Sequence, residues 1–136
     1  MREHEPMIDK TARDLVAPGR GILAADESLP TIEKRFAKIN LSSTEENRRA
    51  YREVLITTEG MEEYISGVIL FDETIRQKTR DGRPFPEVLS GKGVIPGIKV
   101  DKGTEELSEF PGEKVTKGLE GLSERLKDYK DLGAGF

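Results

Sequence analysis

Three charged side chains follow apolar segments at points where strands are expected to end. Asp26 comes directly after residues 22–25, and Lys99 and Asp101 close the segment 94–100. In parallel α/β sheets, ligands bind beyond the carboxyl ends of the strands. Because side chains alternate along a strand, Lys99 and Asp101 are expected to point the same way. The sequence therefore predicts that the three charges gather at one edge of a sheet.

These charges are compatible with several kinds of chemistry. A lysine beside carboxylates at a strand end can act as a nucleophile, a phosphate ligand or an ion-pair partner. The spacing alone favours an ion pair of Lys99 with Asp26 or Asp101. Asp26 fits a catalytic carboxylate, and it fits equally a polar residue that only caps the turn.

Two hydroxyls stand where the next helix is expected to begin. Ser28 and Thr31 follow the first strand, and free backbone N–H groups in a first helical turn suit phosphate. Plain N-capping by Ser28 explains the same residues, and the pattern alone favours it. Arg35 and Arg48 add positive charge nearby, although most cations in such a count are solvated surface groups.

The elements that must hold these groups alternate between strands and helices. Short apolar runs at 21–25, 65–71 and 94–100 are typical of buried strands. Caps and helical spacing predict helices from Pro6 to about Val16, from Ser28 to Asn40, behind a Ser43–Glu46 capping box, at 87–89, and along a stripe from Val115 to Tyr129. This alternation indicates an α/β fold with a parallel sheet covered by helices.

Some of these predictions are specific enough to be checked residue by residue. The helix behind the capping box is expected to bury four side chains, namely Ala50, Tyr51, Val54 and Leu55. The stripe of the last helix is expected to belong to the core. Pro96 lies within the third strand segment, where it would remove a ladder hydrogen bond from a central strand.

Composition excludes several classes of function. The 136 residues carry 22 Lys and Arg against 26 Asp and Glu, a net charge of −4. Nucleic-acid binding needs a clustered basic excess, so no nucleic-acid partner is expected. The chain has no cysteine, and His4 is its single histidine, expected to be an inert surface residue. Thiolate sites, multi-histidine metal sites and histidine triads are thereby excluded within this chain.

Targeting and cofactor signals are also missing from the sequence. No apolar run is long enough to span a bilayer, and the N-terminus lacks the apolar core of a signal peptide. We therefore expect no membrane partner and a cytoplasmic location. The glycines match no dinucleotide or P-loop spacing, so no nucleotide cofactor is expected.

Five segments of the chain resemble class I fructose-bisphosphate aldolases, in the order and with the spacing of that family. They are APGRGILAADES (17–28), STEENRRAYRE (43–53), ISGVILFDET (65–74), PGIKVDKG (96–103) and GLEGLSERLKDY (118–129). The resemblance extends from about residue 15 to residue 136. The segment DESLP (26–30) replaces the DESTG of animal and plant members, which indicates a bacterial branch.

The resemblance implies a (β/α)8 TIM barrel, of which this chain holds the first three βα units. It implies a single domain over 1–136, incomplete because it stops before the fourth strand. The implied activity is the reversible cleavage of fructose 1,6-bisphosphate, in glycolysis, to dihydroxyacetone phosphate and glyceraldehyde 3-phosphate. A lysine Schiff base carries the reaction, without a metal or other cofactor.

The resemblance also implies roles for individual residues. Asp26 matches a first-strand aspartate that positions the substrate and the imine-forming lysine. Lys99 matches a substrate and phosphate ligand, and Ser28 and Thr31 match positions that contact the distal phosphate. Other substrate-binding positions of the family match Arg35 and Arg48.

Further groups of the family lie outside these 136 residues. The resemblance implies that the imine-forming lysine and the acid/base glutamate belong to later strands. The 136 residues alone are therefore expected not to cleave the substrate, and a full-length protein is expected to be a homo-oligomer. Two alternatives stay open: a non-catalytic phosphate-binding or regulatory remnant that keeps Ser28, Thr31 and Lys99, and a structural module.

Overall fold

The computed structural model describes residues 5–136, so His4 lies outside the described residues. A parallel three-stranded sheet has the strand order β1-β2-β3. Its strands are β1 (Gly21–Ala25), β2 (Ile65–Leu70) and β3 (Ile95–Ile98). The remaining elements are α1 (Glu5–Leu15), α2 (Leu29–Ala37), α3 (Glu45–Thr57), the 3-10 turn Met61–Glu63, α4 (Asp72–Ile75), α5 (Phe85–Gly91), β4 (Thr104–Glu106), β5 (Lys114–Thr116) and α6 (Leu122–Asp131).

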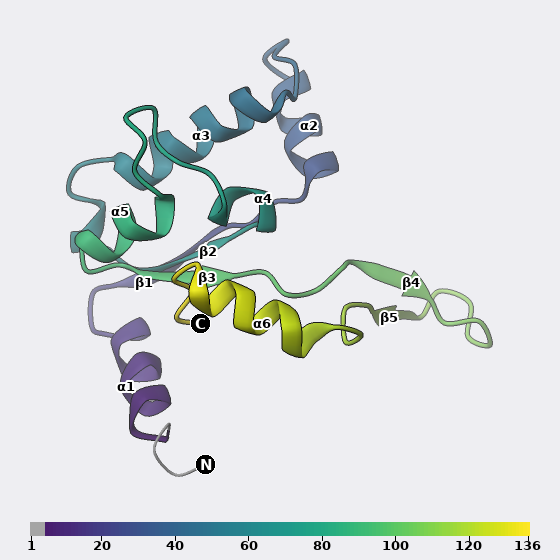
Figure 1. Ribbon diagram of the computed structural model, residues 1–136. Helices are drawn as coiled ribbons and strands as arrows, with labels where there is room; N and C mark the ends of the chain where they lie inside the picture. Colours follow the sequence, from purple (N-terminus) through teal and green to yellow (C-terminus); the bar gives the residue numbers. More distant parts are fainter. Residues whose placement is uncertain (1–4) are drawn as a thin grey trace.

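The helices divide between the two faces of the sheet. In Figure 1, α2, α3, α4 and α5 lie above the sheet, and α1 lies on its other side. Val68 and Leu70 of β2 point to the upper face, where they pack with Ile56 of α3 and Phe85 and Leu89 of α5. All five side chains are 1% exposed or less, so this layer forms the core. The prediction of a parallel sheet with covering helices is confirmed.

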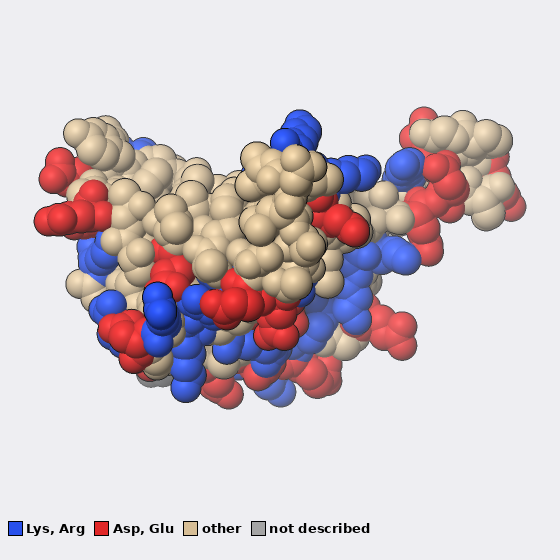
Figure 2. All heavy atoms as spheres, turned by 90° about the horizontal axis from the view of Figure 1, so that it is seen from above, with Lys and Arg blue, Asp and Glu red and all other residues tan. Residues whose placement is uncertain are grey.

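The segment after β3 differs from the prediction. Residues 104–116 form an antiparallel hairpin, β4–β5, in which Glu105 pairs with Val115. The hairpin projects from the body of the molecule in Figure 1, and Figure 2 shows acidic side chains along it. The last helix is therefore only Leu122–Asp131, and the predicted stripe from Val115 onward is wrong. Gly118 and Gly121, both at positive φ, separate the hairpin from the helix.

The predicted core residues of the last helix are corrected as well. Leu119 is 86% exposed and Leu126 is 46% exposed, whereas Tyr129 is 4% exposed. A regular i, i+4 spacing across residues 115–126 predicts one buried face only if all of them are helical. The first part of the stripe belongs to a hairpin and a turn, and within α6 Leu126 lines an open hollow, so of these residues only Tyr129 is buried in the core.

Helix α3 begins one residue later than predicted and buries a different face. Thr44, not Ser43, is the N-cap, and its hydroxyl accepts from the Asn47 N–H at 3.2 Å. The buried residues of α3 are Arg52 and Ile56, spaced four apart. Of the predicted residues, Leu55 is half-buried against the core, Ala50 and Tyr51 are half-buried, and Val54 is 65% exposed. The helix thus turns a charged residue toward the sheet, a choice that hydrophobic periodicity does not predict.

Pro96 costs β3 no hydrogen bond to β2. In an extended strand the N and C=O of one residue point to the same side. The Pro96 carbonyl accepts from Gly135 N–H at 2.8 Å, so the missing donor of Pro96 also faces away from β2. On that side, Phe136 accepts from the Ile98 N–H at 3.0 Å. Residues 135–136 thus pair with the outer edge of β3 and extend the sheet.

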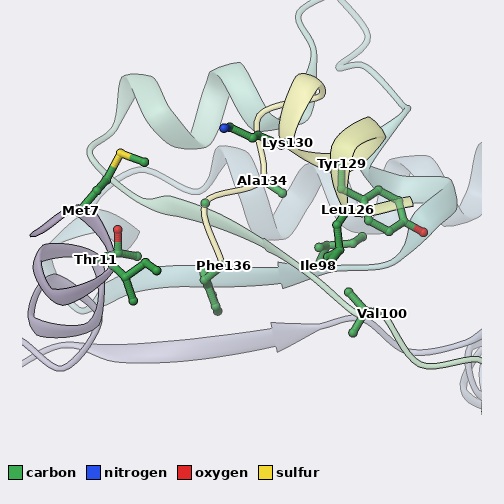
Figure 3. A pocket seen from close by; sticks show the side chains of 11 residues that line it. Met7, Thr11, Ile98, Val100, Leu126, Tyr129, Lys130, Ala134 and Phe136 are labelled. Atoms are coloured by element: carbon green, nitrogen blue, oxygen red, sulfur yellow. The ribbon is translucent and has the colours of Figure 1, made fainter. Parts of the chain in front are cut away.

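The lower face of the sheet is covered only in part. A Cβ added at Gly67 or Gly97 would lie within 3 Å of the Phe136 ring, so this ring rests on both glycines. Beside it lies an open apolar hollow of about 510 Å³, whose lining includes Met7 of α1, Leu126 of α6 and Phe136 (Figure 3). None of the helices within residues 5–136 is long and apolar enough to span a membrane.

This exposed face predicts how the isolated chain behaves. Ile22 of β1 is 45% exposed, and Met7 and Ile8 of α1 are 57% and 66% exposed. Apolar surface of this extent beside a free strand edge favours association. We expect the 136-residue chain alone to bind a hydrophobic dye and to unfold without a single sharp transition. A monomer that melts in one cooperative step, with coincident fluorescence and circular dichroism curves, would contradict this.

Candidate functional site

A second hollow opens beyond the carboxyl ends of the strands, which is where the sequence predicts a site. Its volume is about 600 Å³. Segments that follow β1, β2 and β3 form it together with α6. The lining residues are Ser28, Pro30, Phe71, Asp72, Lys99, Asp101, Lys102, Gly103, Arg125 and Tyr129. Three basic and two acidic side chains thus share one partly apolar hollow.

Lys99 and Asp101 meet as the sequence predicts. The Lys99 N–H donates to the Leu70 carbonyl at 2.9 Å, which continues the β2–β3 pairing past the end of β3. Its Nζ lies 2.6 Å from Asp101 Oδ2, with the two side chains 27% and 33% exposed. The ion pair expected from spacing is therefore present, and it lies at the wall of an open hollow. The ammonium group remains within reach of a ligand there.

The pKa of Asp101 is lowered by its neighbours. The hydrogen bond from Lys99 and, after it, the Gly103 N–H at 2.9 Å lower the pKa of Asp101 below its ordinary value of 3.8. A carboxyl with a lowered pKa stabilises the folded state above its unfolded value, and that stabilisation is lost as the pH falls through the lowered value. The Lys99–Asp101 pair should therefore persist to a lower pH than the ordinary pKa of an aspartate would allow.

The effect of Lys99 on the pKa of Asp101 can be measured directly. In a carboxyl-detected NMR titration, Lys99→Met should move the pKa of Asp101 upward, toward 3.8, because the largest lowering contact is removed. Lys114→Met, which changes an exposed lysine on β5, serves as the matched control and should leave Asp101 unchanged. An unaltered Asp101 titration in Lys99→Met would show that the pair does not persist in solution.

A polar group of α4 and α6 completes the far wall of the hollow. Tyr129 Oη donates to Asp72 Oδ1 at 3.0 Å, and Arg76 bridges Asp72 at 3.0 Å and Asp128 at 2.6 Å. Partial burial raises the pKa of Asp72, but the hydrogen bonds from Arg76 and Tyr129 outweigh it and lower that pKa. Burial, followed by the bond to Asp72, raises the pKa of Tyr129. Asp72 is thus held ionised beside a neutral phenol.

Arg125 fixes the base of the hairpin at this site. Its guanidinium donates to the Val100 carbonyl at 2.8 Å and also to the Gly118 carbonyl. Val100 lies between the paired Lys99 and Asp101, so Arg125 also fixes the strand end that carries them. Sequence reasoning assigned no role to Arg125 or Lys102, although both lie in segments that resemble aldolases, 118–129 and 96–103.

Ser28 reaches the hollow, and Thr31 stands behind it. Ser28 is the N-cap residue of α2, but its hydroxyl makes no capping bond and instead lies 3.2 Å from Thr31 Oγ1. Its carbonyl accepts from the N–H groups of Thr31 and Ile32 at 3.0 Å. The prediction that Ser28 caps α2 through its side chain is therefore wrong. Both hydroxyls keep a free hydrogen-bonding position.

The other predicted residues lie outside the lining of the hollow, within the described part of the chain. Asp26 follows β1, which β2 separates from β3, so about two strand spacings of 4.8 Å lie between Asp26 and Lys99. The Asp26 side chain is half-buried. Arg35 contacts the Glu27 carboxylate and lies 3.4 Å from Tyr51 Oη. The three charges predicted to gather at one edge are thus a close pair and a more distant carboxylate.

The Arg48 guanidinium is hydrogen-bonded to other groups of the protein. Its Nε and Nη2 donate to the two oxygens of Glu73 at 2.7 Å each, a bidentate pair, and Nη1 donates to the Ser43 carbonyl. The bond to Glu73 raises the pKa of Arg48. A ligand that contacts Arg48 directly would have to open this pair.

Comparison with known proteins decides the family. The sequence profile of the family described as fructose-bisphosphate aldolase class-I matches residues 7–136. The chain belongs to the class I fructose-bisphosphate aldolase family. A probable class 1 aldolase from Xanthomonas axonopodis pv. citri is 61% identical over 129 residues, which are 95% of this chain and 39% of that protein. Similarity to bacterial aldolases, including this one, supports the predicted bacterial branch.

More distant aldolases show the same extent of similarity. The Arabidopsis thaliana protein named fructose-bisphosphate aldolase 7, cytosolic, is 54% identical over 98% of this chain and 37% of its own length. An aldolase from Plasmodium falciparum, solved in complex with TRAP and a small molecule inhibitor, superimposes with a TM-score of 0.96. It is 48% identical and is covered over 39% of its chain. The chain thus spans 37% to 39% of the length of these relatives.

The structural match also confirms the fold. Aldolases are TIM-barrel enzymes, and the superposition covers 98% of this chain. The three parallel strands with their helices are therefore βα units of a (β/α)8 barrel. The hollow beyond the strand ends lies on the face that carries active sites in such barrels.

Proposed function

We propose that this chain is part of an enzyme that reversibly cleaves fructose 1,6-bisphosphate into dihydroxyacetone phosphate and glyceraldehyde 3-phosphate. The observation that carries the proposal is the position of Lys99 in an open hollow at the catalytic face of an aldolase-type barrel. The natural partner of such a site is a small sugar phosphate. As a working assignment we place the reaction in glycolysis and the protein in the cytoplasm, as a homo-oligomer in which residues 1–136 belong to one domain.

The proposed reaction separates charge in a way that these residues can support. An amine from a later strand adds to the substrate carbonyl, and the resulting carbinolamine loses water to form a protonated imine. The C3–C4 bond then breaks, the C4 hydroxyl proton leaves to a base, and the imine takes up the electron pair to become an enamine as glyceraldehyde 3-phosphate departs. Protonation of the enamine at C3 and hydrolysis by water then release dihydroxyacetone phosphate and the free amine. We assign Asp26 to orient the imine and the substrate, and Lys99 to bind a substrate phosphate or hydroxyl by a charge-assisted hydrogen bond.

The remaining assignments follow from where each side chain lies. Ser28 lines the hollow, and the Thr31 hydroxyl lies within hydrogen-bond distance of the Ser28 hydroxyl. We therefore assign both to a phosphate group. Arg35 and Arg48 are proposed substrate contacts that would have to exchange their ion pairs with Glu27 and Glu73 for the ligand. No metal or organic cofactor is part of the proposal.

Reductive trapping tests the activity. A polypeptide that carries this chain and extends over the full length of its relatives, when mixed with dihydroxyacetone phosphate and borohydride, should gain one covalently bound triose phosphate by mass spectrometry. Residues 1–136 alone should gain none, because the imine-forming lysine is proposed to lie outside them. Absence of labelling in the long polypeptide, together with absence of cleavage in a coupled assay, would contradict the proposal.

The alternative is a phosphate-binding or regulatory protein that has kept Ser28, Thr31 and Lys99. It is favoured if the long polypeptide binds inorganic phosphate or the sugar bisphosphate but is neither labelled nor active. Isothermal titration of the same preparation distinguishes the two functions.

A further inference from the structure

An arginine inside the fold holds the segment that carries Asp26. Arg52 of α3 is 2% exposed, and it is one of the two buried residues of its helix. Its Nη1 donates to the Ala25 carbonyl and to the Glu27 carboxylate, and its Nη2 donates to the Glu27 carbonyl at 2.9 Å. One guanidinium group thus binds the backbone on both sides of Asp26.

Burying the Arg52 guanidinium costs desolvation free energy, which suggests that this arginine has a functional role. A buried charge loses its hydration and is tolerated only when it is paired and hydrogen-bonded. Here Glu27 supplies the opposite charge, and two main-chain carbonyls accept from Nη1 and Nη2, while the buried Nε–H has no partner among residues 5–136. The centroid of the Tyr51 ring lies 5.5 Å from the guanidinium carbon. An apolar residue would avoid this desolvation cost, but it would leave those carbonyls without this donor.

The contacts of Arg52 with the Ala25 carbonyl and with Glu27, called here the Arg52 clamp, also explain how Asp26 is oriented. Within residues 5–136, no hydrogen bond or ion pair ties the Asp26 carboxylate, so its direction depends on the backbone that carries it. Ala25 is 1% exposed and packs in the upper core, so the alternation of the strand directs Asp26 to the opposite face. Arg52 fixes the carbonyls of Ala25 and Glu27 on the α3 side, which keeps this alternation beyond the end of β1.

Glu27 is fixed from two directions. One of its carboxylate oxygens pairs with Arg52 and the other pairs with Arg35 of α2. Its side chain is 12% exposed, in contrast to the surface ion pair of Lys10 and Asp14, which are 74% and 48% exposed. The segment between β1 and α2 is therefore held by both following helices.

We propose that Arg52 is a positioning residue for Asp26: through the carbonyls of Ala25 and Glu27 it holds the Asp26 carboxylate at the reacting substrate. This inference rests on the proposed aldol cleavage and names a residue that acts in it without touching the substrate. Arg52 is expected to affect the chemical step more than substrate binding, because the substrate phosphates bind elsewhere. A displacement of a catalytic group by about 1 Å can lower the rate by as much as 100-fold.

The test is a double-mutant cycle in the long polypeptide described above. Arg52→Lys keeps the charge but loses the two-armed geometry, so kcat should fall roughly 10-fold to 100-fold with KM changed less than about 3-fold. The double variant Asp26→Asn with Arg52→Lys should have the kcat of Asp26→Asn alone, since Arg52 acts through the group already removed. Arg49→Lys is the matched control, because Arg49 lies on the same helix but pairs with Glu46 and Glu53.

The outcomes separate a positioning role from a purely structural one. An unchanged kcat in Arg52→Lys, or losses that multiply in the double variant, would overturn the inference while leaving aldol cleavage established. An inactive wild-type protein would instead overturn the proposed function. If Arg52→Lys does not fold, as judged by its circular dichroism spectrum, Glu27→Gln replaces it in the cycle. That variant removes one anchor of the same clamp, and the same non-additivity with Asp26→Asn is expected.

Discussion

Asp26→Asn, introduced into a polypeptide of the relatives' full length, should lower kcat for fructose 1,6-bisphosphate cleavage by about 100-fold to 10,000-fold. The amide keeps the size of the side chain but loses the charge that would orient a cationic imine and its proton transfers. KM should change little, because the phosphate contacts are assigned to other residues. Steady-state assays coupled to triose phosphate reduction measure both quantities.

A matched control keeps this result specific. Asp9→Asn makes the same change at an exposed position of α1 and should leave kcat within about 2-fold of wild type. Asp26→Asn should also keep the thermal midpoint of the wild type, since no described residue bonds to its carboxylate. A kcat loss of less than 5-fold in Asp26→Asn would remove Asp26 from the proposed catalytic group.

Lys99→Met should act on binding more than on the chemical step. Lys99 presents its ammonium group to a hollow of about 600 Å³, beside Ser28 and Lys102. Hydrogen bonds that involve a charged group contribute about 1.5 to 3 kcal/mol, which corresponds to a KM for the bisphosphate raised roughly 10-fold to 100-fold. Methionine keeps most of the side-chain length and removes only the charge and its donors.

The control for Lys99 comes from the hairpin. Lys114→Met removes a lysine that is 59% exposed on β5 and lies 3.8 Å from Glu106, so it should change KM by less than 2-fold. Lys99→Arg keeps a positive charge and should recover part of the lost binding. If Lys99→Met and Lys114→Met have the same KM, the hollow beside Lys99 is not where the substrate phosphate or hydroxyl binds.

The order of the elements could be predicted from the sequence because it depends on local patterns. Apolar runs near residues 21–25, 65–71 and 94–100 form strands, since buried parallel strands need no polar alternation. The position of Lys99 and Asp101 at the end of the third run correctly predicted their ion pair. The segments that resemble aldolases identified the family, which the comparison with known proteins confirmed.

Local patterns failed where long-range contacts set the conformation. The spacing of Val115, Leu119 and Leu122 fits a helix, yet Val115 pairs with Glu105 across a hairpin. Such pairing depends on residues ten positions away and on the glycines that turn the chain, so helical periodicity cannot detect it. Arg48 illustrates the same limit, because its partner Glu73 lies on a separate element.

The sequence by itself determined the three strands, the family and the pairing of charges at one strand end, because each depends on residues close together along the chain. Only the tertiary structure decided which carbonyls a buried arginine binds. A charge is stable inside a protein only when distant groups surround it with acceptors. From the sequence alone, Arg52 would be expected on the surface of α3. In the folded chain it binds the carbonyls of Ala25 and Glu27.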